Sequence, residues 1–252
     1  MLESRSNSRP APLTPGGLKS HLPYLFGSRV LIVAAHPDDE VLGCGGTIRL
    51  LIEEGVEVLV LYLSDGVTSR GSHGEKLERQ DIESRLSDAK LALRELGVQN
   101  FKALGLKDNQ LDSYPILDIA KLIESVVGDF KPTFVITHSL SDLNVDHRVA
   151  NQGVLTACRP QPSSQVRGIA SFEVLSSTGW QFDSKNQFAP NLFVDISESL
   201  ESKISALGFF KNEIREFPHP RSLAALESLA KSRGAQLGVP AAEAFEIHYL
   251  RL

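Results

Sequence analysis

The chain has 252 residues, of which 42% are hydrophobic and 23% charged, and its formal net charge is −5. This length and hydrophobic content suit a globular protein with a sizeable core and exclude an intrinsically disordered chain. The negative charge argues against a nucleic-acid-binding protein, and no apolar run reaches the roughly 20 residues that span a bilayer.

The cysteines and the N-terminal residues indicate the cellular compartment and the domain organisation of the protein. Cys44 and Cys158 form no C-x-x-C pair, which argues against a disulfide framework and a thiolate metal cage, so we expect a cytoplasmic protein. Residues 1–27 hold no signal-peptide core and begin with a stretch rich in Ser, Arg, Pro and Gly, so they are predicted to form a flexible arm. Residues 28–252 are predicted to form one domain, and the sequence leaves a homo-oligomer open.

Strands and helices alternate along the first part of the chain. Hydrophobic patterns predict strands at 29–35, 56–63, 101–104 and 132–138, and helices at about 45–54, 75–96, 116–127 and 147–158. The charged residues of the helix 75–96 are expected to form a solvated face, and the helix 116–127 is expected to end at Gly128. Strand, helix and strand joined by short connections predict right-handed parallel crossovers, and hence an α/β fold with a mostly parallel sheet.

The last part of the chain continues with shorter elements. Strands are predicted at 168–178 and 190–196, and helices at 197–210 and about 222–233. Between the second strand and the helix at 75–96, residues 64–74 form a long polar loop that suits a substrate lid, and Arg70 in this loop is a candidate substrate-binding residue.

The first strand ends at a histidine followed by proline and three carboxylates. His36 and Asp39 are three residues apart in a turn, which brings an imidazole nitrogen and a carboxylate oxygen to one point. His147 lies in the loop after another parallel strand, and such loops meet at one edge of the sheet. Two histidines and one carboxylate with an open fourth position form a ligand set typical of catalytic zinc. Asp38 is then the carboxylate that can take a proton from a metal-activated water.

The same corner has a simpler interpretation as a capped turn. Asp38 or Asp39 would then accept backbone N–H bonds at a helix N-terminus. Placing three consecutive carboxylates beside a strand-end histidine is electrostatically costly without a cation, which favours the metal site.

The motifs resemble those of a known family. Ala35-His36-Pro37-Asp38-Asp39-Glu40, followed by Gly43 and Gly45-Gly46, is similar to the signature of the PIG-L/LmbE-like N-acetylglucosaminyl deacetylases, and Thr137-His138 and Asp146-His147-Arg148 resemble its second motif. Pro218-His219-Pro220-Arg221-Ser222 and Ala242-Glu243-Ala244-Phe245 resemble the C-terminal part of bacterial sugar deacetylases. The resemblance covers about residues 28–250.

This resemblance implies a Rossmann-like sheet and a zinc hydrolase that removes the acetyl group from an N-acetylated amino sugar, free, nucleotide-linked or in a glycoconjugate. It implies His36, Asp39 and His147 as metal ligands, with another divalent metal as the alternative to zinc, and Asp38 as the general base. The chain departs from the family at Asn144, where a histidine is usual. An asparagine can donate a hydrogen bond to an oxyanion but cannot protonate the leaving amine. The acid is then protonated Asp38, His219 or His138, and we favour Asp38 assisted by His219.

Other polar residues near the motifs are candidates for supporting roles. We expect Glu40 to support the turn, and Asp146 to orient His147 or Asn144 or to cap the following helix. His138 either touches the site or bonds to backbone at the strand end. Arg221 either binds a sugar or phosphate oxygen or pairs with a surface acid.

Two further functions compete with sugar deacetylation. A zinc amidase acting on another small acylated amine would use the same metal chemistry. A non-catalytic sugar- or nucleotide-binding Rossmann-like module gains slight support from the glycines at 43, 45 and 46, but the G-x-G-x-x-G pattern is absent and carboxylates would repel a phosphate.

Overall fold

The structure, a computed structural model, describes residues 22–70 and 75–251, and within these ranges the side chains of residues 70 and 75–78 lie outside the description. The elements in chain order are α2 Leu22–Phe26, β1 Arg29–Ala34, α3 Asp39–Glu53, β2 Glu57–Ser64, η1 Thr68–Arg70, α4 Glu75–Glu95, β3 Asn100–Leu106, η2 Leu111–Ser113, α5 Ile116–Phe130, β4 Phe134–His138, α6 Val145–Ala157, β5 Gly168–Phe172, η3 Thr178–Trp180, β6 Leu192–Asp195, α7 Leu200–Leu207, α8 Leu223–Ala235 and β7 Ala242–Leu250.

The strands form one seven-stranded sheet in the order β3-β2-β1-β4-β5-β7-β6. The five strands β1 to β5 run parallel, and β7 is antiparallel to both β5 and β6. The predicted α/β fold with a mostly parallel sheet is therefore confirmed. The strand order reverses between β1 and β4, and ligands of open α/β sheets bind at such a switch point, beyond the carboxyl ends of the strands.

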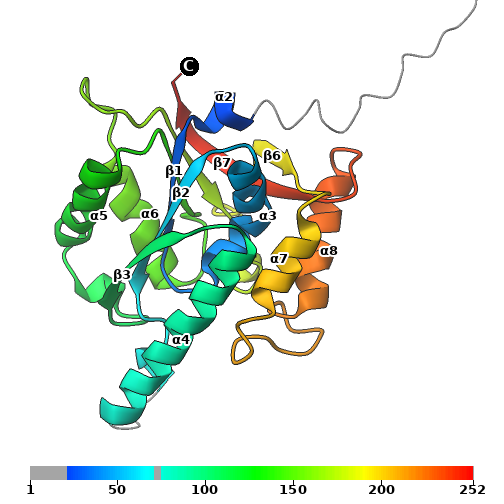
Figure 1. Cartoon of the computed structure of the whole chain (residues 1–252), viewed down its shortest axis with the longest axis horizontal. Helices are drawn as coiled ribbons and strands as arrows, with labels where there is room; N and C mark the ends of the chain where they lie inside the picture. Colours follow the sequence, from blue (N-terminus) through cyan, green and yellow to red (C-terminus); the bar gives the residue numbers. More distant parts are fainter. Residues whose placement is uncertain (1–21, 71–74, 252) are drawn as a thin grey trace, which may run out of the picture.

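Helices cover both faces of the sheet (Figure 1). Helices α5 and α6 pack against each other on one face, and α3, α4, α7 and α8 cover the other. Each face has its own apolar core, one centred on Ile32, Tyr62 and Phe172 and the other on Leu31, Leu61 and Val135. Because β1 contributes alternate residues to the two cores, its run of buried apolar residues is that of a central parallel strand.

The start of the domain differs from the predicted arm at residues 1–27. Residues 1–21 lie outside the described chain, but Leu22–Phe26 forms helix α2, and Phe26 is fully buried. Its ring packs edge-on against Phe134 of β4, with ring centroids 4.8 Å apart. Apolar packing thus holds the last residues of the predicted arm on the sheet.

Helix α3 begins six residues earlier than predicted and contains a kink. It starts at Asp39, and Cys44 has the non-helical angles φ −144° and ψ 23°. The kink frees the backbone amides of Gly46 and Thr47, which donate to the buried carboxylate of Glu243 at 2.9 and 2.7 Å. Lys203 of α7 pairs with the same carboxylate. A strand and a helix from the end of the chain therefore cap the second half of α3.

A close contact fixes α3 against the sheet. A Cβ atom added to Gly43 would lie 2.1 Å from the Phe172 ring of β5, so only glycine lets the helix approach this closely. Helix α5 also differs from its prediction, because it continues through Gly128 to Phe130 and ends where Lys131 takes a left-handed conformation with φ 53°. A glycine does not end a helix that tertiary packing extends.

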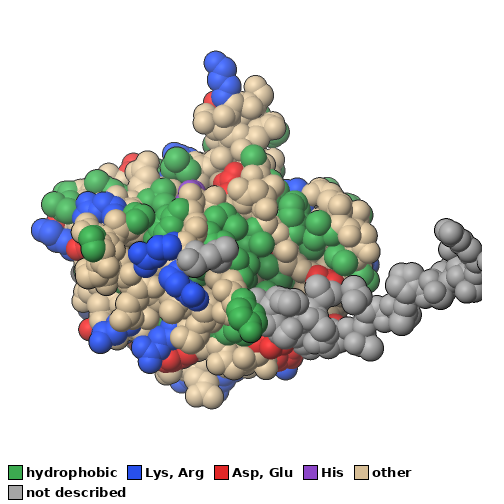
Figure 2. Space-filling model, turned by 90° about the horizontal axis from the view of Figure 1, so that it is seen from above, with side chains coloured by type: hydrophobic (Ala, Val, Ile, Leu, Met, Phe, Trp, Pro, Cys, Tyr) green, Lys and Arg blue, Asp and Glu red, His purple; other side chains and the backbone are tan. Residues whose placement is uncertain are grey.

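Figure 2 shows the face at the top of Figure 1, which carries α2, with hydrophobic side chains gathered near its middle and Lys and Arg side chains beside them.

Strand β7 was missed by the sequence analysis, since its alternating Ala, Glu and Phe residues also fit a helix or loop. Within the described ranges, no helix is long and apolar enough to span a membrane.

Candidate metal centre and active site

The residues after β1 and those after β4 meet at the switch point of the sheet. His36 follows β1 directly, and Asp39 opens α3. His147 lies in the first turn of α6, beyond the loop that follows β4. All three side chains are at least 94% buried. The parallel topology thus places the three predicted metal ligands together, as expected from the strand ends.

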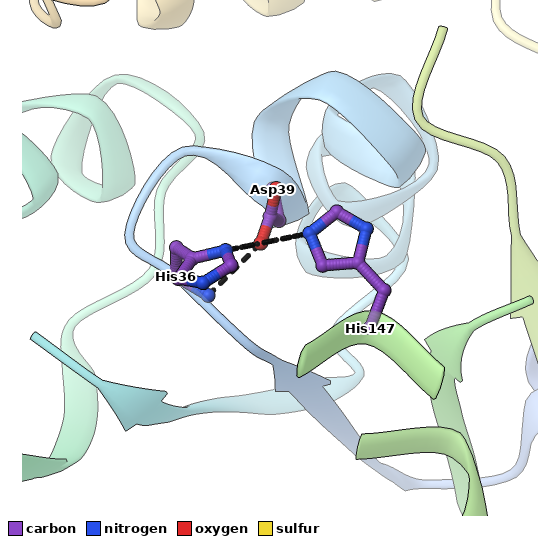
Figure 3. Close-up of side chains that lie close together, drawn as sticks. All are labelled: His36, Asp39 and His147. Carbon is purple, nitrogen blue, oxygen red and sulfur yellow. Dashed lines mark hydrogen bonds and ion pairs between the residues drawn. The ribbon is translucent and has the colours of Figure 1, made fainter. Parts of the chain in front are cut away.

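Three ligand atoms converge (Figure 3). Asp39 Oδ2 lies 3.0 Å from His36 Nδ1 and 3.2 Å from His147 Nε2, and the two imidazole nitrogens are 3.3 Å apart. A tetrahedral ion with bonds of about 2.0–2.1 Å separates its ligand atoms by roughly 3.3 Å. The spacing of the three atoms therefore fits a metal ion bound between them.

Carboxylates on the far side of each imidazole select the nitrogen that faces the cluster. Asp108 and Asp146 lie 3.0 and 3.1 Å from Nε2 of His36. Asp142 lies 3.0 Å from Nδ1 of His147. When these nitrogens carry the proton, His36 Nδ1 and His147 Nε2 keep their lone pairs for a metal. Such carboxylate–histidine pairs orient the ligands of metal sites and raise their basicity.

The electrostatic field of the cluster favours positive charge. Burial opposes protonation of His147, but Asp39 and Asp142 raise its pKa to about 9. Burial likewise opposes the charge of His36, and Asp39 raises its pKa well above the usual value. Burial raises the pKa of Asp39, but the three neighbouring histidines lower it well below its usual range. A bound cation would satisfy the same field that otherwise draws protons to the imidazoles.

The second carboxylate oxygen of Asp39 supports a metal ion at this cluster. Among the described residues, Asp39 Oδ1 has no hydrogen-bond partner, although the side chain is fully buried. A buried carboxylate oxygen without a partner is costly. With the two imidazoles, this carboxylate forms a donor set that fits zinc.

Asp38 is buried next to the cluster in a strained backbone conformation. Its angles are φ 119° and ψ −26°, a left-handed region that a residue with a side chain rarely adopts. The Glu40 carboxylate holds this turn by accepting the Asp38 amide at 3.1 Å, and Tyr62 in turn donates to Glu40 at 2.6 Å. Burial raises the pKa of Glu40 to about 8. Glu40 thus lies under the turn, as expected.

Two arginines pair with the same carboxylate oxygen of Asp38. Arg85 and Arg221 each approach Asp38 Oδ2 to 3.1 Å, and both also pair with Glu213. Burial raises the pKa of Asp38, and the two arginines oppose that shift. Asp38 Oδ1 has no partner among the described residues, although this oxygen is buried.

Arg85 corrects the expectation for α4. The charged residues of this helix were expected to form a solvated face, yet the side chain of Arg85 is only 5% exposed. It reaches from α4 to the turn after β1, and its guanidinium also lies 5.2 Å from the ring centre of Phe210. Arg221 likewise pairs with buried carboxylates rather than with a surface acid.

The role of Asp146 differs from the predicted one, which was to orient His147 or Asn144 or to cap α6. Its carboxylate contacts His36 and accepts the amides of Asn109 and Leu111 at 2.8 and 2.9 Å, so it orients neither His147 nor Asn144. The cap of α6 is Asn144, whose Oδ1 accepts the amide of Asp146 at 2.8 Å. Asn144 Nδ2 donates to Asn109 at 3.2 Å, and its second hydrogen has no partner among the described residues.

His138 touches the cluster and also bonds to backbone. Its Nε2 accepts the amide of Ala35 at 2.9 Å, and its ring stacks on that of His147 with centroids 3.8 Å apart. Burial and the neighbouring His147 lower the pKa of His138 well below its usual value. Both predicted alternatives therefore apply, and the neutral ring supports His147.

A pocket of about 270 Å³ reaches the metal cluster at His147. Its lining includes His147 and three further residues named from the sequence, Asn144, His219 and Arg221, together with Ser176, Ser177, Trp180, Glu213 and Arg215. Nδ1 of His219 accepts the Arg221 amide at 3.0 Å, and its ring lies edge-on to Trp180 with centroids 6.1 Å apart. The side chain of Arg70 lies outside the described part of the chain.

Comparison with known proteins identifies the family. Residues 31–158, just over half of the chain, match the family described as PIG-L: GlcNAc-PI de-N-acetylase. The chain belongs to the PIG-L family. The matched segment runs from β1 to the end of α6 and contains all three candidate ligands.

Two relatives of this PIG-L protein are named for different activities. A Bacillus cereus protein named probable N-acetyl-α-D-glucosaminyl L-malate deacetylase 2 is 27% identical over 191 residues, 73% of this chain and 83% of that protein. A Pseudomonas putida protein named 4-oxalmesaconate hydratase is 27% identical over 189 residues, 70% of each chain.

A solved structure shares the fold. The N,N'-diacetylchitobiose deacetylase of Pyrococcus horikoshii superposes with a TM-score of 0.71 and 24% identity over 88% of this chain and 84% of that one. The likeness supports the α/β assignment that the sheet topology already establishes.

Four charged residues whose side chains pair with the site residues were missed by the sequence analysis: Arg85, Asp108, Asp142 and Glu213. Asp142 had a detectable signal, because it lies in the polar loop between the strand-end His138 and His147. The other three come from segments that carry no motif, and only the folded chain brings them to the switch point.

Proposed function

We propose that the protein is a zinc-dependent hydrolase that removes the acetyl group from an N-acetylated amino sugar or its glycoconjugate. The observation that carries the proposal is the convergence of His36 Nδ1, Asp39 Oδ2 and His147 Nε2 within 3.0–3.3 Å beside the buried Asp38. Membership of the PIG-L family and the name of the Bacillus cereus relative support acetamido sugars as the substrate class.

The ion would be held by His36, Asp39 and His147. A zinc ion bound there supplies Lewis acidity, which polarises the amide carbonyl and lowers the pKa of a water towards about 7. Asp38 takes the proton of the attacking water through Oδ1, while Arg85 and Arg221 hold its other oxygen in place. The water oxygen bonds to the carbonyl carbon, and negative charge develops on the carbonyl oxygen.

His219 serves the oxyanion as a neutral donor. Because its Nδ1 accepts the Arg221 amide, the ring proton of the neutral imidazole lies on Nε2. A neutral Nε2–H donates a hydrogen bond readily but is far too weak an acid to protonate an amine. His219 and the free hydrogen of Asn144 Nδ2 are therefore assigned to the developing oxyanion.

The proton for the leaving amine then comes from Asp38. The carboxyl group that accepted the water proton returns it to the nitrogen as the carbon–nitrogen bond breaks, so acetate and a primary amine leave. Burial, which raises the pKa of Asp38, helps it to hold the proton between the two steps. One carboxylate thus acts as both base and acid, which accommodates the asparagine at position 144.

The experiment combines metal analysis with a substrate panel. Protein purified without chelator is assayed for zinc content and for primary amine released from N-acetylglucosamine, its glycosides and simple N-acetylated amines. We expect one zinc per chain, chelator-sensitive release of amine, and a preference for the sugars. Protein that holds no zinc and shows no chelator-sensitive release would refute the proposal. Equal rates on simple acylamines would instead identify a general amidase.

A hydratase is the second candidate, because the Pseudomonas putida relative bears that name at the same 27% identity. An activated water adds to a carbon–carbon double bond in such a reaction. An unsaturated dicarboxylic acid in the same panel, followed by its ultraviolet absorbance, separates this activity from deacetylation.

A further inference from the structure

We propose that a surface beside the active-site pocket binds a hydrophobic group attached to the amino sugar of the substrate. This apolar shelf consists of Leu143, Trp180 and Phe182 and lines a shallow hollow of about 510 Å³. The inference rests on the proposed function and narrows its substrate class to acetamido sugars that carry an alkyl or aryl group.

The shelf is continuous with the active-site pocket. Trp180 lines both hollows, and Leu143 of the shelf directly precedes Asn144 of the pocket. A sugar whose acetamido group reaches the metal cluster therefore has its remaining substituents next to the shelf. Pockets for small molecules commonly combine such apolar walls with a few placed polar groups.

Hydrogen bonds tie the shelf to the metal cluster. Trp180 ends the short helix η3, and Ser177 and Thr178 at the start of this turn donate to Asp142 Oδ2 at 2.9 and 2.6 Å. The same Asp142 oxygen contacts His147. The indole is thus held at a fixed position relative to the reacting centre, as a binding platform requires.

The exposure of the shelf indicates a ligand surface. Leu143 is 51% exposed, Trp180 44% and Phe182 85%. Single exposed apolar residues are ordinary, but adjacent ones that line a hollow beside a pocket mark binding sites.

The polar residues of the hollow favour a hydrophobic occupant over a second sugar. Gln181 Oε1 accepts the amide of Asp183, and both Asp183 oxygens accept hydrogen bonds within the following turn. These oxygens already accept hydrogen bonds, and the wall of the hollow is mostly apolar, whereas a pyranose ring needs polar partners for its hydroxyls. The aliphatic Leu143 beside two aromatic rings suits an alkyl or aryl group.

Binding can be measured without turnover, because Trp180 is the single tryptophan of the chain. Its fluorescence is titrated with the methyl and hexyl glycosides of N-acetylglucosamine. Each fully buried methylene tightens binding about fourfold, and partial burial of the five additional ones predicts at least about tenfold tighter binding of the hexyl glycoside. Equal affinities would overturn the inference even if neither glycoside is hydrolysed.

A pair of variants locates the effect. Phe182→Ser should reduce the ratio of hexyl to methyl affinity, and the matching ratio of kcat/KM, by about threefold or more. The control is Tyr24→Ser, since Tyr24 is an aromatic residue 79% exposed on α2, at the opposite end of β1 from the site. An unchanged ratio in Phe182→Ser would refute the shelf. Tighter binding of N,N'-diacetylchitobiose than of the hexyl glycoside would also refute it, in favour of a second sugar.

Discussion

Replacing Lys203 tests how the C-terminal elements hold the helix that carries Asp39. The Lys203 ammonium pairs with the Glu243 carboxylate, and both side chains are only 3% exposed. Lys203→Met leaves this carboxylate buried without its counter-charge. Removing one partner of a buried pair costs about 3–5 kcal/mol. Because the amides of Gly46 and Thr47 and the Thr47 hydroxyl still donate to Glu243, we expect the lower end, about 3 kcal/mol.

Equilibrium unfolding in urea, followed by circular dichroism, measures this loss. A loss of about 3 kcal/mol should also lower the melting temperature by about 6–12 °C for a chain of this length. The matched control is Lys102→Met, since Lys102 pairs with Asp129 at 3.2 Å but is 45% exposed, and we expect it to cost at most about 1 kcal/mol.

A double-mutant cycle sharpens the same test. Lys203→Met combined with Glu243→Gln removes both charges, so the double variant should be less destabilised than the sum of the two single variants. Equal, small losses in Lys203→Met and Lys102→Met, or strict additivity in the cycle, would refute the account of a charged cap on the second half of α3.

Three further predictions concern the site and its surroundings. Asp142→Asn should weaken zinc binding about 10–100-fold, measured by competition with a chromogenic chelator, because Asp142 orients the His147 imidazole; unchanged affinity would contradict this. His219→Ala should lower kcat by about 10²–10³ while zinc content stays at the wild-type value, because it removes one oxyanion donor. Burial lowers the pKa of His248 below its usual 6.5. The unfolded chain then binds the His248 proton more readily, so this residue contributes a fall in the free energy of unfolding as the pH drops below about 6.5. Between pH 7.5 and 5.5 the wild type should therefore lose stability relative to His248→Gln, as measured by urea unfolding at the two pH values.

The sequence predicted the part of the site that local pattern determines. A buried strand that ends at His36, and a polar loop after a second strand that leads to His147, suffice to bring two ligands together, because parallel strands share one edge. Asp39 follows from its spacing to His36 in the turn. These residues lie in motifs whose structural context is local, which is why they were found.

The other residues of the site and its support could not be predicted, because their positions depend on contacts between segments distant in the sequence. Arg85 lies on a helix rich in charge, where nothing in the pattern separates one buried arginine from its solvated neighbours. The burial of Glu243 was missed for a related reason, because a charged residue in an alternating strand ordinarily faces solvent. The sequence pattern also says nothing of the exposure of Trp180, and only the fold shows it 44% exposed between two hollows.

The central claim is that Asp38 moves the proton at a metal site held by its neighbours, and Asp38→Asn tests it most directly. The measurement is kcat for amine release from an N-acetylglucosamine glycoside by zinc-loaded protein, with zinc content determined on the same sample. We predict that the variant retains one zinc per chain and loses activity by about 10²–10⁴-fold, since the amide cannot accept the water proton. Wild-type kcat in a fully zinc-loaded Asp38→Asn protein would contradict the account.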